Sequence, residues 1–409
     1  MLFALCFLVA GVTARPAQGQ TYKVLYTFTG GSDGGSPYAA PVVDSKGNLY
    51  GTAFGGGNAG CSEEVGCGTV FELTPSPEGW SESTLHSFTG GADGANPFDS
   101  LILDAAGNLY GTAEDGGDPC ETYGCGLAFE LSPGSGGWTE TVLYDFPGGT
   151  EGYYPIAALT RDRQGNLYST MSNGGSQGHG IVYELTESGG TWGQKVLNTV
   201  VDEPLELVIF DQSGNLYTTT SFGGKGDCGT VVELLHGSSK VNVLYAFTGS
   251  SGCRVRGGLA FDRAGNLYGT TEIGGTYGMG TVYKLTHSKS GKWTETVLHS
   301  FKGGSDGYYP QYCTPIFDKA GNLYGTTEDG GDMSTCDGNG CGTVFKMTPG
   351  KGGRWKKTIL HRFVGGSDGI GPIPGVVRDS AGNLYGTTVE GGNAGCGGFG
   401  CGVVFEITP

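Results

Sequence analysis

The sequence predicts an all-β protein, a seven-bladed β-propeller whose four-stranded blades are closed into a ring by the N-terminal strand. Three observations predict this fold. One string, Asp-x-x-Gly-Asn-Leu-Tyr, occurs seven times along the 409 residues. Each copy lies in a unit with four short segments rich in Val, Leu, Phe, Tyr and Thr, and four-strand units in series are typical of propellers. The last unit lacks a fourth strand, and the start of the chain supplies one.

The second unit shows most clearly the four strands, which we name A to D in each blade. Strand A is expected at 101–104, strand B at 108–112, strand C at 126–131 and strand D at 138–146. The repeated string forms the A–B hairpin, because Asp can bond the turn backbone and Gly accepts a positive φ. Its seven copies begin at Asp44, Asp104, Asp162, Asp211, Asp262, Asp318 and Asp379.

The two ends of the chain predict how the ring closes. Unit seven ends with a strand C at 403–407, and residues 22–28 match strand D of the other units. We therefore expect 22–28 to complete the seventh blade, which removes the exposed sheet edges that invite aggregation. Residues 20–409 are predicted to be one propeller domain.

The first 19 residues are predicted to be a signal peptide. An apolar run from Leu2 to Val12 is followed by small residues, with candidate cleavage after Ala14 or Gly19. No later segment is long and apolar enough to span a membrane, so we expect a secreted or cell-envelope protein. We also expect the protein to be a monomer. The net charge, 23 − 40 = −17, argues against a nucleic-acid partner, because phosphate binding requires Lys and Arg.

The units resemble a known repeat. The Gly-Asn-Leu-Tyr segments, the strand from Gly68 to Leu73, and the Phe-Thr-Gly-Gly-x-Asp-Gly loops that begin at Phe28 and Phe88 are similar to the tandem GloVer repeat of exported bacterial proteins. The resemblance covers residues 21–409 and implies export and surface display. The A–B hairpin is also similar, more generally, to that of NHL-repeat propellers.

Eight of the 12 cysteines form four local pairs in the loops between strands B and C. Paired cysteines can also hold zinc, but export and the wide spacing favour disulfides. The four loops with a pair are longer than the three without one, as expected if each disulfide closes a long loop. The predicted disulfides are Cys61–Cys67, Cys120–Cys125, Cys336–Cys341 and Cys396–Cys401.

Three further cysteines remain, and strand alternation indicates how two of them pair. Cys228 lies in a B–C loop and Cys253 in the next D–A loop, and both loop types lie on the same face of a propeller. Although the three cysteines can pair in three ways, we predict Cys228–Cys253 and leave Cys313 free.

The long B–C loops belong to units 6, 7, 1 and 2, which are consecutive in a closed ring. They are acidic and contain no Lys or Arg. This pattern predicts an asymmetric acidic binding surface for a basic protein, Ca²⁺ or a glycan held through Ca²⁺; the alternative is loops that merely aid solubility. The candidate binding residues are Glu63, Glu64, Glu114, Asp115, Asp118, Glu121, Tyr123, Glu328, Asp329, Asp332, Asp337, Glu390 and Phe399.

The Gly-Gly-x-Asp-Gly loops between strands D and A hold a second set of acids. A ring of such carboxylates near the channel mouth would bind cations, whereas in the alternative interpretation each Asp caps its own turn. The candidate metal ligands are Asp33, Asp93, Asp306 and Asp368.

We therefore predict a non-enzymatic binding propeller whose stapled acidic face meets an extracellular protein or glycan. One alternative is a carbohydrate- or lactone-directed enzyme with acids at the channel mouth, because paired carboxylates can serve as general acid and base. Another is a structural cell-envelope protein. The sequence contains no Ser-His-Asp arrangement or paired His spacing, so no catalytic residue is assigned.

Overall fold

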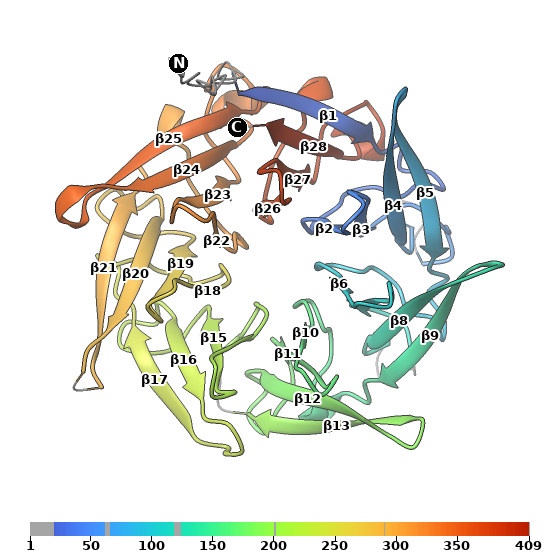
Figure 1. Cartoon of the computed structure of the whole chain (residues 1–409), viewed down its shortest axis with the longest axis horizontal. Helices are drawn as coiled ribbons and strands as arrows, with labels where there is room; N and C mark the ends of the chain where they lie inside the picture. The colour runs from blue at the N-terminus through green and yellow to red at the C-terminus, as the bar shows by residue number, and fades with distance from the viewer. Residues whose placement is uncertain (1–19, 62–65, 118–123, 200–201, 290, 409) are drawn as a thin grey trace, which may run out of the picture.

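The computed structural model describes residues 20–61, 66–117, 124–199, 202–289 and 291–408. Within them, the strands form seven four-stranded antiparallel sheets arranged as a ring around a central axis (Figure 1). The predicted seven-bladed propeller is confirmed. In each blade, strand A lies nearest the channel and strand D lies at the outer edge, as the sheet order shows.

The strands of each type are similar in length around the ring. Strand A comprises β2 (Val42–Val43), β6 (Ile102–Leu103), β10 (Thr160–Arg161), β14 (Ile209–Phe210), β18 (Ala260–Phe261), β22 (Ile316–Phe317) and β26 (Val377–Arg378). Strand B comprises β3 (Leu49–Ala53), β7 (Leu109–Ala113), β11 (Leu167–Met171), β15 (Leu216–Thr220), β19 (Leu267–Thr271), β23 (Leu323–Thr327) and β27 (Leu384–Thr388).

The outer two strands are longer than strand B, except β16 (Thr230–Leu234), which has the same length as β15. Strand C comprises β4 (Thr69–Ser76), β8 (Leu127–Gly134), β12 (Ile181–Ser188), β16 (Thr230–Leu234), β20 (Thr281–His287), β24 (Thr343–Pro349) and β28 (Val403–Thr408). Strand D comprises β5 (Gly79–Ser87), β9 (Gly137–Asp145), β13 (Thr191–Asn198), β17 (Val241–Ala246), β21 (Trp293–Ser300), β25 (Trp355–Arg362) and β1 (Thr21–Thr27). Short 3₁₀ turns lie at Gly149–Glu151, Gly304–Asp306, Cys336–Gly338, Lys351–Gly353, Gly366–Asp368 and Cys396–Gly398.

The repeated string is a structural device. In the first blade, Asp44 accepts hydrogen bonds from the backbone N–H groups of Lys46 (2.8 Å) and Asn48 (2.9 Å), and Gly47 has a φ of 91°. The Tyr50 hydroxyl donates to Glu72 of strand C at 2.9 Å. The bond from the Asn N–H to the Asp recurs at the other six A–B hairpins. The Tyr–Glu bond recurs in blades 2, 3, 4 and 7, whereas Lys284 and Lys346 stand at the Glu position in blades 5 and 6. The hairpin aspartates therefore stabilise their own turns.

The blades pack through aromatic rings. A Phe at the end of each of six D strands is fully buried, as Phe88 is, and meets a ring of the following blade edge-on, such as Phe129 at 5.3 Å. That second ring lies under strand B of its own blade. A Cβ at Gly111 would be 2.6 Å from the Phe129 ring, which explains the glycine in strand B. All residues of the seven B strands are buried between neighbouring sheets.

The N-terminal strand closes the ring as predicted. β1 pairs antiparallel with β28 from Thr21 opposite Thr408 to Thr27 opposite Val403, so the two ends of the described chain lie side by side (Figure 1). The part of the chain that the structure describes contains no helix that could cross a membrane.

Candidate functional site

The B–C and D–A loops lie on the same face, as predicted, and pair with each other near the channel. Single bridges join Ala95 to Asp115 and Tyr308 to Asp329. One residue closer to strand B, the N–H groups of Glu114 and Glu328 donate to D–A loop carbonyls at 3.2 and 3.0 Å. This backbone ladder fixes the acids that follow strand B at the rim of the channel.

Three of these acids affect the ionisation of one tyrosine. Burial raises the pKa of Tyr38, and the negative charges of Glu390, Glu328 and Glu114 raise it further. These carboxylates come from blades 7, 6 and 2, and Tyr38 lies in the segment that enters blade 1. Part of the predicted acidic surface thus lies within electrostatic range of one side chain, and its role in binding stays a prediction. We call Glu114, Glu328, Glu390 and Tyr38 the channel-mouth cluster.

The environment of the cluster makes ionisation of the acids costly. Burial, and then the charge of Asp115, raises the pKa of Glu114 to about 7. Burial, and then Asp329, raises the pKa of Glu328 to about 7, and burial raises that of Asp329 to about 6. The pKa values of Asp115 and Glu390 are raised by burial as well. The mouth thus holds carboxyl groups that exchange protons near neutral pH.

Aromatic rings line the channel beside these acids. Tyr38 stacks on Phe98 at 4.8 Å and meets Phe54 edge-on at 5.5 Å. Phe98 in turn meets Tyr312 at 6.0 Å, which extends the cluster towards blade 6. The mouth therefore combines carboxylates with aromatic faces, a combination that suits both cationic groups and sugar rings.

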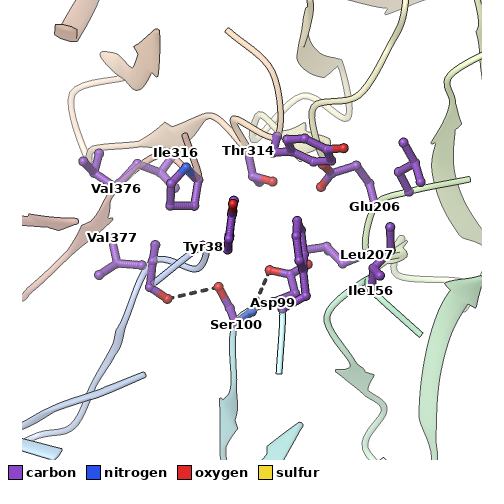
Figure 2. Close-up of a pocket in the computed structure, with 15 residues that line it drawn as sticks. Tyr38, Asp99, Ser100, Ile156, Glu206, Leu207, Thr314, Ile316, Val376 and Val377 are labelled. Carbon is purple, nitrogen blue, oxygen red and sulfur yellow. Dashed lines mark hydrogen bonds between the residues drawn. The ribbon is translucent and has the colours of Figure 1, made fainter. Parts of the chain in front are cut away.

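Tyr38, Phe98 and Tyr312 also line a chamber of about 160 Å³ (Figure 2). Apolar side chains such as Leu207 and Val376 form much of its wall, but Asp99 and Glu206 line it with carboxyl groups (Figure 2). Asp99 accepts hydrogen bonds from the backbone N–H groups of Ser100 (2.6 Å) and Ala158 (2.7 Å). Glu206 is 4% exposed, and burial together with the charge of Asp99 raises its pKa well above the usual range.

Sequence reasoning missed these channel residues, although a signal exists. Both acids stand two residues after a proline, Pro97 or Pro204, at the entry to strand A. Other units have Ala39, Ala157 or Gly257 at the same place. A comparison of units position by position would have singled out the two acids.

The mouth differs on the side of blade 5. There Glu272 is held by Arg254 and Arg256, each with a nitrogen 3.2 Å from a carboxylate oxygen. This acid is neutralised by its neighbours, whereas no ion pair is recorded for Glu114, Glu328 or Glu390 among the described residues. Ion pairing of the acids therefore differs between the side of blade 5 and the side of blades 2, 6 and 7.

The other candidate residues of the long loops are not part of the cluster. Asp332 is fully exposed and binds Ser334 of its own loop, and Asp337 lies in an exposed turn. Phe399 is 68% exposed. The remaining candidates lie outside the described residues: Glu63, Glu64, Asp118, Glu121 and Tyr123.

The D–A loop aspartates lie beside the outermost strand, at the rim of the face and not beside the channel. Asp33 accepts from the Thr29 N–H (2.8 Å) and the Tyr26 hydroxyl (3.0 Å). Asp93, Asp306 and Asp368 make the matching contacts to a histidine of strand D. Each therefore caps its own turn. Within the described ranges, no group of three or more His, Cys, Asp or Glu side chains could hold a metal ion, so Ca²⁺ binding stays a prediction.

The disulfide predictions hold wherever the structure describes both cysteines. Cys61–Cys67, Cys336–Cys341 and Cys396–Cys401 are bonded, and so is Cys228–Cys253. Cys125 is disulfide-bonded, while Cys120 lies outside the described residues. Cys313 is free and buried, as expected.

The fold and its loop face define a disulfide-stapled seven-bladed propeller with an acidic channel mouth. The Gloeobacter/Verrucomicrobia repeat matches residues 11–201 and 203–409, and the chain belongs to this family. No match is found among curated proteins.

Comparison with solved structures finds distant similarities. A putative 6-phosphogluconolactonase from Bacteroides uniformis ATCC 8492 is 12% identical, with a TM-score of 0.50 over 79% of this chain and 84% of that chain. A gluconolactonase from Xanthomonas campestris is 15% identical (TM-score 0.39, 69% and 78% covered). A protein of unknown function from Dyadobacter fermentans DSM 18053 is 12% identical (TM-score 0.41, 83% and 97% covered). At these identities the likeness concerns the fold alone.

Proposed function

We propose that the protein is an exported, non-enzymatic binding propeller that receives a positively charged group of an extracellular partner at the channel-mouth cluster. The observation that carries the proposal is that single backbone bridges hold Asp115, Asp329 and Glu390, from blades 2, 6 and 7, on the same loop face. The charges of Glu114, Glu328 and Glu390 from these loops raise the pKa of Tyr38. Export is supported by the apolar start of the chain and by the disulfides, which persist in oxidising compartments.

A cationic group would offset the free-energy cost of ionising these buried acids. A Lys or Arg side chain of a partner would favour the ionised carboxylates and could lie against the face of Tyr38 or Phe54. The net charge of −17 would steer basic partners towards the protein at low salt. Binding should release protons, because it requires ionisation of groups with a pKa of about 7.

The test is calorimetric titration with a lysine-rich peptide at pH 6 and pH 8. We expect tighter binding at pH 8, and at least tenfold weaker binding when Glu114→Gln and Glu328→Gln are combined. The matched control is Asp332→Asn, which removes a fully exposed acid from the same loop as Glu328 and should leave the affinity unchanged. Absence of binding, or equal loss in both variants, contradicts the proposal.

Ca²⁺ or a Ca²⁺-held glycan is the other ligand class to compare. A ligand that binds only the folded state raises the melting temperature. Melting in EDTA and then in millimolar Ca²⁺ therefore separates metal binding from binding of an organic cation. An upward shift that Asp115→Asn and Asp329→Asn abolish would replace the basic partner with a metal ion.

One observation favours a second candidate, a carbohydrate- or lactone-directed enzyme. Two carboxyl groups with a pKa of about 7 at a channel mouth match the requirement for a general acid and base near neutral pH. This function predicts hydrolysis of a lactone or glycoside with a bell-shaped pH profile that Glu328→Gln abolishes. If the wild-type protein shows neither binding nor hydrolysis, a structural cell-envelope role would remain.

A further inference from the structure

The chamber lined by Tyr38, Phe98 and Tyr312 lies at the axis of the ring, because six blades contribute to its walls. The residues that line it stand in strand A, or within a few residues before it, in blades 1, 2, 3, 4, 6 and 7. Strand A is the innermost strand of each sheet. Figure 2 shows the side chains of Asp99 and Glu206 around this space, each carried by a different blade.

These two carboxyl groups face the chamber without a cation beside them. Glu206 is buried and Asp99 is half-buried, and neither has a recorded ion pair within the described ranges. Burial raises the pKa of both acids, and the charge of Asp99 raises that of Glu206 further. Arg256, which affects the ionisation of Tyr312 beside the chamber, pairs with Glu272.

The described groups that act on Glu206 supply a hydrogen bond but no counter-charge. The Thr314 hydroxyl stabilises its ionised form by a hydrogen bond, which does not neutralise it. The charge of Glu206 in turn acts on Tyr283, Tyr312 and Cys313. Burial raises the pKa of each of these three groups, so they are neutral near pH 7 and cannot balance a carboxylate.

The walls of the chamber fit an unbranched alkylammonium group. Leu207, Ile316 and Val376 offer apolar contacts to methylene groups. The rings of Tyr38 and Phe98, stacked at 4.8 Å, offer aromatic surface to a cation. A cavity of about 150 Å³ can hold benzene, and pentylammonium has as many heavy atoms as benzene. The size of the chamber, about 160 Å³, therefore suits a chain of this length.

Lys357 shows that the fold already buries a group of this kind. Its ammonium lies beside Asp306 and above the rings of Phe301 and Phe345, so a carboxylate and two aromatic rings are enough to hold it. A metal ion matches the chamber less well, because Ca²⁺ takes roughly six to eight oxygen ligands. In the part of the chain that the structure describes, no three His, Cys, Asp or Glu side chains are grouped so that they could hold a metal.

We propose that the chamber binds an unbranched primary alkylammonium group, whose nitrogen pairs with the Glu206 carboxylate and whose methylene chain contacts the apolar walls. Binding at pH 7 should release a proton to the solvent. The protonated Glu206 loses its proton when it becomes the counter-ion, and the ammonium group keeps its own.

Two sources carry this chemistry, a lysine side chain of a partner and a small free alkylamine. The chamber adjoins the channel-mouth cluster, because Tyr38 belongs to both and Tyr312 lies within electrostatic range of Glu206 and of Glu328. A lysine side chain would enter past the cluster with its backbone outside, so for this source the inference rests on the proposed function. A free alkylamine needs no partner.

The experiment titrates the protein with pentylamine hydrochloride by calorimetry at pH 7, in two buffers of different ionisation enthalpy. We expect saturable binding with release of about one proton, and at least tenfold weaker binding of pentan-1-ol, which has the same chain but no charge. Glu206→Gln should weaken pentylamine binding at least tenfold. Glu295→Gln is the matched control, because it removes a half-buried acid of the outer strand β21 whose pKa burial raises to about 7; the affinity should stay within twofold.

Three results would overturn the proposal. These are no saturable binding of pentylamine, equal binding of pentan-1-ol, or full binding by a folded Glu206→Gln variant. If Glu206→Gln does not fold, the proton release of the wild-type protein decides, because binding without it contradicts pairing with a protonated acid.

Titration with N-acetyl-L-lysine methylamide separates the two sources. Binding of this probe as well as pentylamine supports a partner's lysine. Binding of pentylamine alone supports a free alkylamine in the chamber and counts against the proposed function. Binding of the lysine-rich peptide without binding of pentylamine leaves the proposed function in place and overturns the role of the chamber.

Discussion

At the scale of single residues, Lys357 shows how one blade balances a buried charge. Its side chain is 6% exposed, its Nζ lies 3.1 Å from Asp306, and it sits 4.4 Å above the Phe301 ring. Burial lowers the pKa of Lys357 to about 8, although Asp306 opposes this effect. The lysine is therefore tolerated because the aspartate of the D–A loop is next to it.

Asp306→Asn should leave this lysine without its counter-charge. Removing one partner of a buried pair costs roughly 3 kcal/mol, and we expect a loss of that size in the free energy of unfolding at pH 7, measured by chemical denaturation. Asp368→Asn is the matched control, because Asp368 holds His361 and its own turn but no buried lysine. It should cost about 1 kcal/mol; equal losses would refute the role of Lys357.

In blade 2, Glu140 occupies the position that Lys357 has in blade 6, but the neighbouring D–A loop aspartate repels it instead of pairing with it. Burial, and then the charge of Asp93, raises its pKa to about 7, and its buried Oε1 has no hydrogen-bond partner. A carboxyl group whose pKa is raised by folding contributes stability below its unfolded pKa, and that contribution is lost as the pH rises through 7.

Glu140→Lys should therefore stabilise the protein, because a lysine here would face Asp93 as Lys357 faces Asp306 in blade 6. At pH 8 we expect a gain of about 1 kcal/mol in unfolding free energy, reduced from the full pKa difference by partial exposure. At pH 5 the gain should be smaller, because Glu140 is then protonated. Denaturation curves at both pH values check the prediction, and a larger gain at pH 5 would contradict it.

The residues of the channel show where sequence reasoning ended. Glu114 and Glu328 stood out because they depart from the unit in long, acidic loops. Asp99 and Glu206 did not, because a single acid in a short segment carries no periodic signal and the channel is formed only when all blades meet. Tyr38 and Phe98 lie in the same short segment before strand A of their units, so their stacking could not be foreseen from the sequence either.

At the scale of elements, the B–C loops were predictable because loop length and cysteine content vary together. In the structure, the disulfides differ in the sequence separation that they span. Cys336–Cys341 closes a ring within one loop, with a sequence separation of 5, whereas Cys228–Cys253 spans 25 residues and joins a B–C loop to the next D–A loop. The second bond thus ties blade 4 to the connection into blade 5.

The two disulfides should differ in energy accordingly. In the chain-entropy treatment, the longer span contributes roughly 3 kcal/mol and the shorter roughly 2 kcal/mol. We expect Cys228→Ser with Cys253→Ser to lower the unfolding free energy by about 1 kcal/mol more than Cys336→Ser with Cys341→Ser. Denaturation under identical oxidising conditions measures both, and a larger effect of the short bond would contradict this ranking.

At the scale of the whole molecule, the fold was predictable because seven hairpins repeat one string and because the end units complement each other. Thr21 lies opposite Thr408, so a short linker between residues 20 and 408 should not disturb the ring. A circular permutant with new ends in the exposed turn at Ser135 and Gly136 should fold and melt at or above the temperature of the parent protein.

A truncation provides the contrast to this permutant. Removing residues 20–27 deletes β1 and exposes the edge of β28, which should cause self-association through strand pairing. Size-exclusion chromatography with melting curves distinguishes the two proteins. A monomeric, fully stable truncation would show that the ring does not need β1.

The pairing of β1 with β28 also imposes an order on events during synthesis. β1 is made before any blade, yet its partner Val403–Thr408 is made after all the others. The two strands must find each other across almost the entire chain, and such distant contacts form late and slowly. A nascent chain interrupted before Val403 therefore keeps an open sheet edge at each side of the gap, and these edges distinguish it from a finished molecule for any protease or chaperone that meets it.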